Sequence, residues 1–401
     1  MTYCGGMRRF LVGAGAGLTL GYALVRTSEA LRELRRPAAP LEPNPARYGR
    51  LRRGLMLAGI VRSVAALGAA AYGLGPRLEP LPGERESRAR RMSLIAAGLA
   101  LSTLVELPGD FVEGLVLERR YGLSKQTPGA WLGDRLKSFG VSVAIGVPLA
   151  EVLVASIARA PRRWPLLATA GTFPLLVLAN VVAPTFIAPL FNRFAPLDGD
   201  LAGDIRALAA RYGAGDATIL RVDMSRQTEK ANAYVTGLFG TKRIVVGDTL
   251  LDHFEPRETL FVVAHELGHY VARDVWRAVG IGTAAAALIF FGAQRLALRR
   301  AAGSLATTAG VARLMFAISL LGLGAEPVIA AFSRSRERSA DGFAVSATGG
   351  PAAGAAAFRR LRERNQAEDE QPKWMELLFA SHPSLGSRIA RLDSAHEGAS
   401  A

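Results

Sequence analysis

The sequence predicts a mainly α-helical integral membrane protein, with about seven spanning helices and a small α+β domain on one face. Half of its 401 residues are hydrophobic, and the mean hydropathy of +0.21 is high for a soluble protein. Seven nearly uncharged apolar segments alternate with polar ones, and a single long polar segment, 192–275, has the mixed patterning of a folded domain. The net charge of +15 comes from arginines beside the apolar segments, without interleaved aromatics. This charge pattern favours a membrane protein with basic loops and argues against a nucleic-acid partner.

Each apolar segment is a candidate span, because a helix of about 20 residues crosses a bilayer. The first segment follows Arg8 and Arg9 and also has the composition of a signal peptide. No small-x-small cleavage site precedes Arg32, so we favour a retained span. The seven segments are 10–25, 54–75, 92–117, 138–157, 164–191, 278–294 and 314–332.

Three acids interrupt the third segment. Glu106, Asp110 and Glu113 are spaced i, i+4 and i+7, which places them on one helix face. Carboxylates are costly against lipid, so this face is expected to meet protein or water. Alternatively, the helix begins or ends near Pro108 and the later acids lie at the membrane interface.

The polar segments show the elements of a small α+β domain. Residues 200–212 have helical spacing, while 219–222, 231–238 and 243–246 are β-branched runs bounded by turn residues. Residues 240–242 are expected to close a hairpin. After the last span, 333–364 is expected to be helical with a break at 349–351, and a final helix starts near Ser384. Four parts follow: an N-terminal membrane region 1–191, a polar domain 192–275, two spans within 276–332, and a C-terminal polar part 333–401 that is expected to complete the same domain.

The two polar parts are expected to share one membrane face, because an even number of spans separates them. By the positive-inside rule, the arginine-rich first and third loops would then place that face on the cytoplasmic side of a cell inner or plasma membrane. The second loop is also basic, which weakens the assignment of this face to the cytoplasm. The single cysteine, Cys4, excludes an intramolecular disulfide framework.

The sequence His265-Glu266-Leu267-Gly268-His269 is the strongest local signal. Pro256 and Glu258 suit the start of a helix here, and residues four apart share a helix face. Both imidazoles could therefore bind one Zn²⁺, with Glu266 beside its water as general base. The alternative is a helix with two hydrogen-bonded histidines.

A catalytic zinc needs a third protein ligand. Glu337 and Asp341 lie one helical turn apart after the last span. We expect Glu337 to bind the metal and Asp341 to accept the outer N–H of a ligating histidine. A surface helix with alternating charges would also have this sequence, but its pairing with His265 and His269 favours the ligand interpretation.

Two further segments are candidates for substrate contacts. His382 could polarise the scissile carbonyl together with the metal, although it could instead cap the following helix. Asn232, Ala233 and Tyr234 could form a free strand edge that pairs with an extended peptide, or an ordinary hairpin strand.

Together, five motifs resemble those of the type I CaaX prenyl proteases: H-E-L-G-H, S-R-x-x-E-x-x-A-D, N-A-Y-x-x-G, Y-G-L-S-K-Q-T (121–127) and S-H-P-S-L-x-x-R. The resemblance runs from about Glu118 to Arg388. It implies seven spans enclosing a water-filled chamber, lined by acids such as Glu106, Asp110 and Glu113, with a zincin-like metalloprotease domain and one zinc at the mouth.

The resemblance also assigns individual roles. His265, His269 and Glu337 would be ligands, Glu266 the base, His382 and Arg388 contacts to the substrate carbonyl, and Asn232 part of the substrate strand. The substrate would be a peptide or protein, possibly lipidated, beside membrane lipid. Val235 and Thr236 depart from the bulkier residues frequent in the family, which leaves side-chain preference open.

Two other functions remain as alternatives for this sequence. A quality-control metalloprotease of the heat-shock type shares the motifs but usually has fewer spans. An inactive scaffold or transporter would be expected to lose Glu266 or a ligand, and none is missing.

Overall fold

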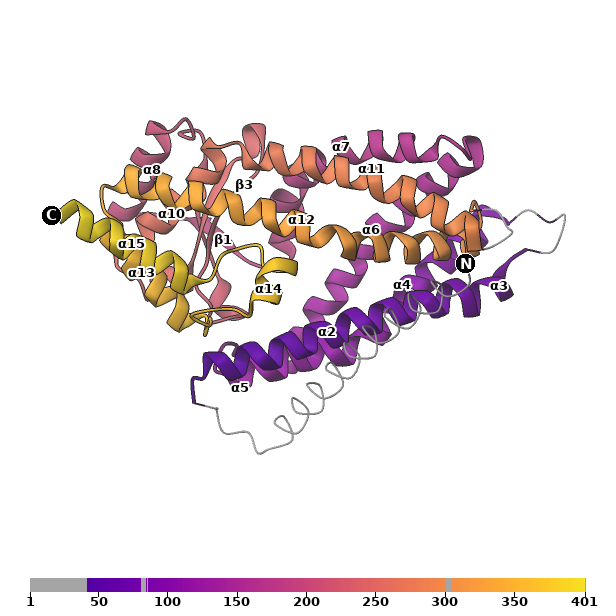
Figure 1. The fold of residues 1–401 in the computed structure, drawn as a ribbon, viewed down its shortest axis with the longest axis horizontal. Helices are drawn as coiled ribbons and strands as arrows, with labels where there is room; N and C mark the ends of the chain where they lie inside the picture. The colour runs from indigo at the N-terminus through magenta and orange to yellow at the C-terminus, as the bar shows by residue number, and fades with distance from the viewer. Residues whose placement is uncertain (1–41, 81–83, 85, 301–304, 401) are drawn as a thin grey trace, which may run out of the picture.

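The computed structural model describes residues 42–80, 84, 86–300 and 305–400 (Figure 1). The expected first span, 10–25, lies outside these residues. Within them, six helices are long and apolar enough to cross a membrane, and they coincide with the other six expected spans. These are 45–78, 88–120, 128–159, 164–190, 274–297 and 308–348.

The spanning helices expose large apolar side chains, as a lipid-facing surface requires. Leu288 is 77% exposed and Val328 is 69% exposed. Three of the helices continue through short π-helical turns. α2 (Pro45–Ala69) passes through Ala70–Leu74 into α3 (Gly75–Leu78), and α4 (Arg88–Phe111) passes through Val112–Leu117 into α5 (Glu118–Arg120). α7 (Trp164–Val182) passes through Ala183–Ile187 into the 3₁₀ turn Ala188–Leu190. The remaining spanning helices are α6 (Pro128–Arg159), α11 (Asp274–Arg300) and α12 (Thr308–Thr348).

Two of the three acids of this span, Glu106 and Asp110 of α4, form ion pairs with neighbouring helices. Glu106 accepts hydrogen bonds from Arg62 and Ser63 of α2, and Asp110 lies 3.4 Å from Arg135 of α6. α4 continues past Pro108 as a helix, and the alternative that the membrane span begins or ends there stays a prediction. These pairs explain how the charges are accommodated, while a chamber-lining role stays a prediction.

The long polar segment forms a four-stranded sheet in the order β1-β2-β4-β3, with β3 (Ala233–Thr236) at one edge. β4 (Arg243–Gly247) pairs parallel with β2 (Thr218–Val222) and antiparallel with β3. β1 (Phe194–Pro196), which the sequence did not predict, pairs antiparallel with β2. The expected hairpin joins β3 to β4 through the 3₁₀ turn Phe239–Thr241.

Helices pack beside this sheet to form the core of the polar end. α8 (Asp200–Arg211) and α10 (Pro256–Val271) contribute Ile205, Phe261 and Leu267, which are almost fully buried. Two short helical segments, Met224–Arg226 and α9 (Asp248–Leu251), flank β4. A single core therefore supports the helix that carries both motif histidines.

The seventh expected span and the helix expected after it are one element. α12 runs unbroken over 41 residues and ends at Gly349, whose φ of 72° is left-handed. α13 (Pro351–Arg364) then starts with proline, which suits a first helical position. α14 (Lys373–Leu378) and α15 (Leu385–Ser400) complete the chain. Glu337 is thus carried on a helix that extends from the membrane region into the polar core.

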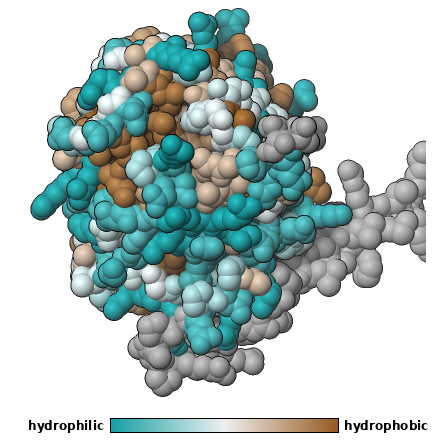
Figure 2. Space-filling model, turned by 90° about the vertical axis from the view of Figure 1, so that its left-hand side faces the viewer, coloured by the Kyte–Doolittle hydropathy of each residue, from teal (hydrophilic) through white to brown (hydrophobic). Residues whose placement is uncertain are grey.

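All polar parts gather at one end of the molecule (Figure 1). The loop 121–127 joins them, because Ser124 donates to the carbonyl of Gln227 and Glu229 donates through its N–H to the carbonyl of Leu123. Arg53 of α2 binds Glu368 of the C-terminal part. Figure 2 shows this end as mainly hydrophilic, with one apolar area in its upper part.

Candidate metal centre

The helix α10 brings the two motif histidines onto one face. Its start is capped: Pro256 occupies the first turn, and the N–H of Glu255 donates to the Glu258 carboxylate at 2.9 Å. One turn separates His265 from His269, and their ring centroids lie 4.9 Å apart. The apolar faces of α10 are buried, so this helix is held in a fixed orientation.

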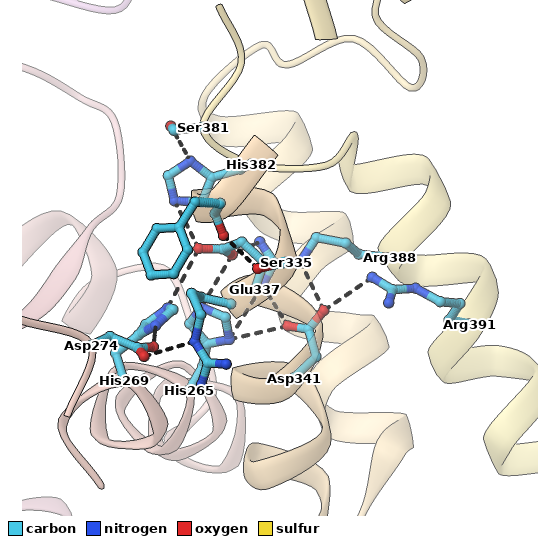
Figure 3. Close-up of polar contacts among 12 residues, drawn as sticks. His265, His269, Asp274, Ser335, Glu337, Asp341, Ser381, His382, Arg388 and Arg391 are labelled. Atoms are coloured by element: carbon cyan, nitrogen blue, oxygen red, sulfur yellow. Dashed lines mark hydrogen bonds and ion pairs between the residues drawn. The ribbon is translucent and has the colours of Figure 1, made fainter. Parts of the chain in front are cut away.

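Glu337 of α12 meets both histidines. Its Oε2 lies 3.4 Å from His265 Nε2, and its Oε1 lies 3.4 Å from His269 Nε2. Close packing of the two helices makes this possible, because a Cβ on Gly268 would lie 3.2 Å from the Ala340 Cα. Figure 3 shows the three side chains turned toward one another.

These three residues fit a divalent metal ion. One ligand atom from each lies within 4.8 Å of the others. Glu337 is only 2% exposed, and its Oε2 has no hydrogen-bond partner among the described residues. The Arg388 guanidinium lies 3.2 Å from this oxygen as an ion pair, and a metal ion would supply the further partner that a buried carboxylate oxygen requires. Two imidazoles and one carboxylate form the donor set of many catalytic metal sites, and they leave a fourth position free.

A carboxylate lies behind each histidine. Asp341 Oδ1 lies 3.1 Å from His265 Nδ1, the contact expected from the sequence. Asp274, the first residue of α11, lies 2.9 Å from His269 Nδ1. Each carboxylate fixes the Nδ1–H tautomer and turns Nε2 toward Glu337.

Sequence reasoning missed Asp274. It lies five residues after His269, off the helical face, and reaches the ring only because the chain breaks at Arg273 between α10 and α11. Arg336 and Arg277 donate to its Oδ1 at 2.7 and 3.1 Å. Arg336, the basic residue next to Glu337, was therefore the available signal for a nearby acid. The alternating charges around Glu337 are equally typical of a solvated surface helix, so this signal was not recognised.

Arg388 lies within the centre rather than at its surface. It is 6% exposed, donates to Asp341 at 2.6 Å, and lies 3.2 Å from Glu337 Oε2. Its guanidinium also stacks on Phe358, 4.1 Å from the ring centroid. This arrangement stabilises two buried carboxylates; the expected contact with a substrate carbonyl stays a prediction.

His382 stands at the open side of the centre. Its Nε2 lies 3.2 Å from Glu337 Oε1, and its Nδ1 lies 2.7 Å from the Ser381 hydroxyl. The side chain is 61% exposed, so it can reach a ligand that approaches from solvent. It precedes α15, but within the described residues its side chain makes no hydrogen bond to the start of that helix.

Burial and charge shift the titration of the α10 groups. Burial raises the pKa of Glu266. Burial lowers the pKa of His265, but hydrogen bonds to Asp341 and Glu337 outweigh it and raise that pKa to about 9. Burial also lowers the pKa of His269, but hydrogen bonds to Glu337 and Asp274 outweigh this effect, so its pKa is raised. Protons therefore compete with a metal for the two imidazoles.

The candidate substrate strand is at the edge of the sheet. Asn232 is exposed and Tyr234 half-buried, whereas Ala233 is buried. The carbonyl of Asn232 accepts from the N–H of Gly247. An edge strand can pair with an added extended peptide, and the role of these three residues stays a prediction.

Two family models match almost the whole described chain. The model of peptidase family M48 matches residues 197–396. The model described as CAAX prenyl protease N-terminal, five membrane helices, matches residues 52–193. The metal centre thus lies within the peptidase match, and the match to the N-terminal membrane region precedes it.

Curated relatives agree with these models. An uncharacterized metalloprotease of Bacillus subtilis, YhfN, is 32% identical over 72% of this chain and 70% of its own length. CAAX prenyl protease 1 of Saccharomyces cerevisiae is 38% identical, and its homolog in Dictyostelium discoideum is 37% identical. The last two alignments cover 44% and 45% of this chain, and only 40% and 43% of the relatives' own length.

A solved structure has the same fold. The crystal structure of S. mikatae Ste24p matches with a TM-score of 0.72, covering 94% of this chain and 97% of that one at 24% identity. The predicted fold class is confirmed: a mainly helical membrane protein with a small sheet, whose arrangement fits a membrane chamber.

Proposed function

Because the chain belongs to peptidase family M48, as a membrane metalloprotease of the CAAX prenyl protease type, we propose that it uses one zinc ion to hydrolyse peptide bonds next to the membrane. The observation that carries the proposal is the convergence of His265, His269 and Glu337, with Glu266 beside them. His265, His269 and Glu337 would hold the zinc. When bound, zinc supplies Lewis acidity toward water and the scissile carbonyl.

The side chains then have separate tasks. Glu266 takes a proton from the attacking water and passes it to the leaving amine, and its raised pKa suits this exchange. His382 donates to the carbonyl oxygen as negative charge develops there. Asp341 and Asp274 keep the imidazoles oriented, and Arg388 neutralises the buried carboxylates.

The variant Glu266→Gln tests the mechanism, because glutamine keeps the shape of the side chain but cannot accept the proton. Peptide hydrolysis is expected to fall by a factor of roughly 10² to 10⁴, while zinc measured by elemental analysis stays at one per chain. Asp252→Asn, an exposed carboxylate outside the metal centre, serves as the control and should retain both. Undiminished hydrolysis in purified Glu266→Gln would remove Glu266 as the base.

The proposed substrates are prenylated or otherwise membrane-associated peptides, processed near their C-terminus. Two relatives named CAAX prenyl protease and the matching N-terminal membrane region support this class. Membrane lipid would then surround the protein, and a lipid group would also form part of a prenylated substrate. The match to five membrane helices favours this class over a quality-control protease.

Paired peptides, with and without a farnesyl group, test the lipid requirement in the detergent-purified protein. A higher kcat/KM for the farnesylated peptide is expected, since the added chain gains apolar contacts. Equal rates for both peptides would restrict the function to a membrane metallopeptidase without lipid specificity.

We also propose that the catalytic end faces the cytoplasm. The arginine-rich segments at the start of α2 and at α5, both at this end, support the assignment through the positive-inside rule.

A further inference from the structure

A pocket opens directly beside the metal centre. Its volume is about 320 Å³, and it lies between the end of β3 and the end of α10. Glu266 and His269 line one part of it, and Val235, Leu238 and Trp276 line the rest. A peptide held at the metal centre would therefore place neighbouring residues in this pocket.

The walls of the pocket are largely apolar and partly exposed at the rim. Trp276 packs edge-on against Phe239, with ring centroids 6.0 Å apart. Phe239 is 64% exposed and belongs to the β3–β4 turn. Tyr212 and Tyr270 complete the lining. Such walls suit apolar side chains of a short peptide.

Arg273 is the one arginine that lines the pocket. It is exposed, and its side chain forms no ion pair or hydrogen bond within the described part of the chain. The neighbouring carboxylate, Asp274, does not pair with Arg273 but is bound to His269, Arg277 and Arg336. The pocket thus combines apolar walls with a cation whose charge has no protein partner among the described residues.

The backbone at Arg273 is also unusual. Its φ of 56° lies in the left-handed region, which glycine or asparagine adopts more readily at a helix end. The chain thus turns at Arg273 between α10 and α11, where this residue lines the pocket.

We propose that Arg273 binds the free C-terminal carboxylate of the substrate, whose residues after the scissile bond occupy this pocket; the inference rests on the proposed peptidase function. A planar guanidinium binds a carboxylate through two parallel hydrogen bonds. The enzyme would thereby select bonds close to the end of a chain.

The geometry limits the length of the tail. Arg273 follows His269 by four residues and lies beyond the end of α10, so the two Cα atoms are at most about 14 Å apart, and the arginine stem adjusts this reach. An extended peptide advances about 3.3 Å per residue. The carboxylate is therefore expected about two to four residues after the cleaved bond.

Matched peptides with a C-terminal acid or a C-terminal amide test the proposal with the full-length zinc-loaded enzyme. Wild type is expected to cleave the acid with a kcat/KM roughly 10- to 100-fold higher, the usual size of a hydrogen-bonded charge contact. Arg273→Gln should reduce this acid-to-amide ratio to about one, and Arg273→Lys should keep part of it. Arg206→Gln, an exposed arginine on α8 outside the pocket, should keep the wild-type ratio.

A peptide series with one to six residues after the scissile bond adds a second test. The acid preference should be largest at two to four residues and disappear in longer tails. A wild-type enzyme that cleaves acids and amides equally at every length would overturn the carboxylate assignment while leaving the peptidase function intact.

Binding without turnover separates the two hypotheses. Calorimetry of tripeptide acids and amides with Glu266→Gln is expected to show tighter binding of the acid, and loss of this difference when Arg273→Gln is added. This difference would support the carboxylate site even if no hydrolysis were detected in any variant. Equal binding of acid and amide would overturn it.

Discussion

At the scale of single residues, two carboxylates orient the histidines of the metal centre, and arginines neutralise the charge of both carboxylates. Asp341 accepts from His265 and from Arg388, while Asp274 accepts from His269 and from Arg336. The arginines stabilise negative charge that burial would otherwise make costly. Each histidine is thereby oriented by a fixed acceptor, so the metal site is largely formed before an ion binds.

Asp274→Asn is expected to weaken zinc binding by roughly 10- to 100-fold. Asparagine keeps the size of the side chain but no longer holds the His269 ring with a charged acceptor. Competition with a chelator of known affinity measures the change. Asp252→Asn, exposed and distant from the imidazoles, is the control. An unchanged zinc affinity in Asp274→Asn would show that its contact with His269 is incidental.

At the scale of elements, two features bring the site together. α12 is a single helix that carries Glu337 from the membrane region into the polar core. The β3–β4 hairpin supplies both the sheet edge and one wall of the pocket. The turn of this hairpin depends on Gly237, whose φ is 87° and whose added Cβ would lie 2.1 Å from the Thr241 carbonyl oxygen.

Gly237→Ala is expected to destabilise the protein by about 1–3 kcal/mol, because alanine is strained at this φ and clashes with the turn. A thermal unfolding midpoint in detergent measures the loss, and peptide hydrolysis should fall with it. Gly240→Ala lies in the same turn, has open space around its Cβ and no left-handed φ, and should change stability little. Similar midpoints for the two variants would contradict this account of the hairpin.

At the scale of the whole molecule, segments far apart in the chain form one polar end. α10 precedes one pair of spans and Glu337 lies at the end of that pair, so both return to the same side. The loop 121–127 is hydrogen-bonded to the same end. Any assignment of one segment to a membrane side therefore assigns the others.

Labelling of introduced cysteines tests this sidedness, since Cys4 is the only native cysteine and can be replaced by serine. Asp204→Cys on α8 lies at the catalytic end, and Arg162→Cys lies in the short loop between α6 and α7 at the other end. An impermeant thiol reagent is expected to label Arg162→Cys in intact cells and Asp204→Cys only after permeabilisation. The reverse pattern would place the catalytic end outside.

The sequence by itself determined the features that depend on local spacing. Hydropathy located the six spans within the described residues, and the four-residue spacing of His265, His269, Glu337 and Asp341 predicted which side chains would share a helix face. Such periodicities report the physics of one element and its solvent, which is why they can be recognised without the rest of the fold.

Only the tertiary structure decided the contacts between elements. It brought Asp274 to His269 through a helix break, buried Arg388 among carboxylates, set β3 at the edge of the sheet, and put Arg273 beside an apolar pocket. None of these follows from a residue's own neighbours in the chain, because each depends on how helices and strands pack against one another. The same packing energy that closes the core thus determines which of many charged side chains meet at the centre.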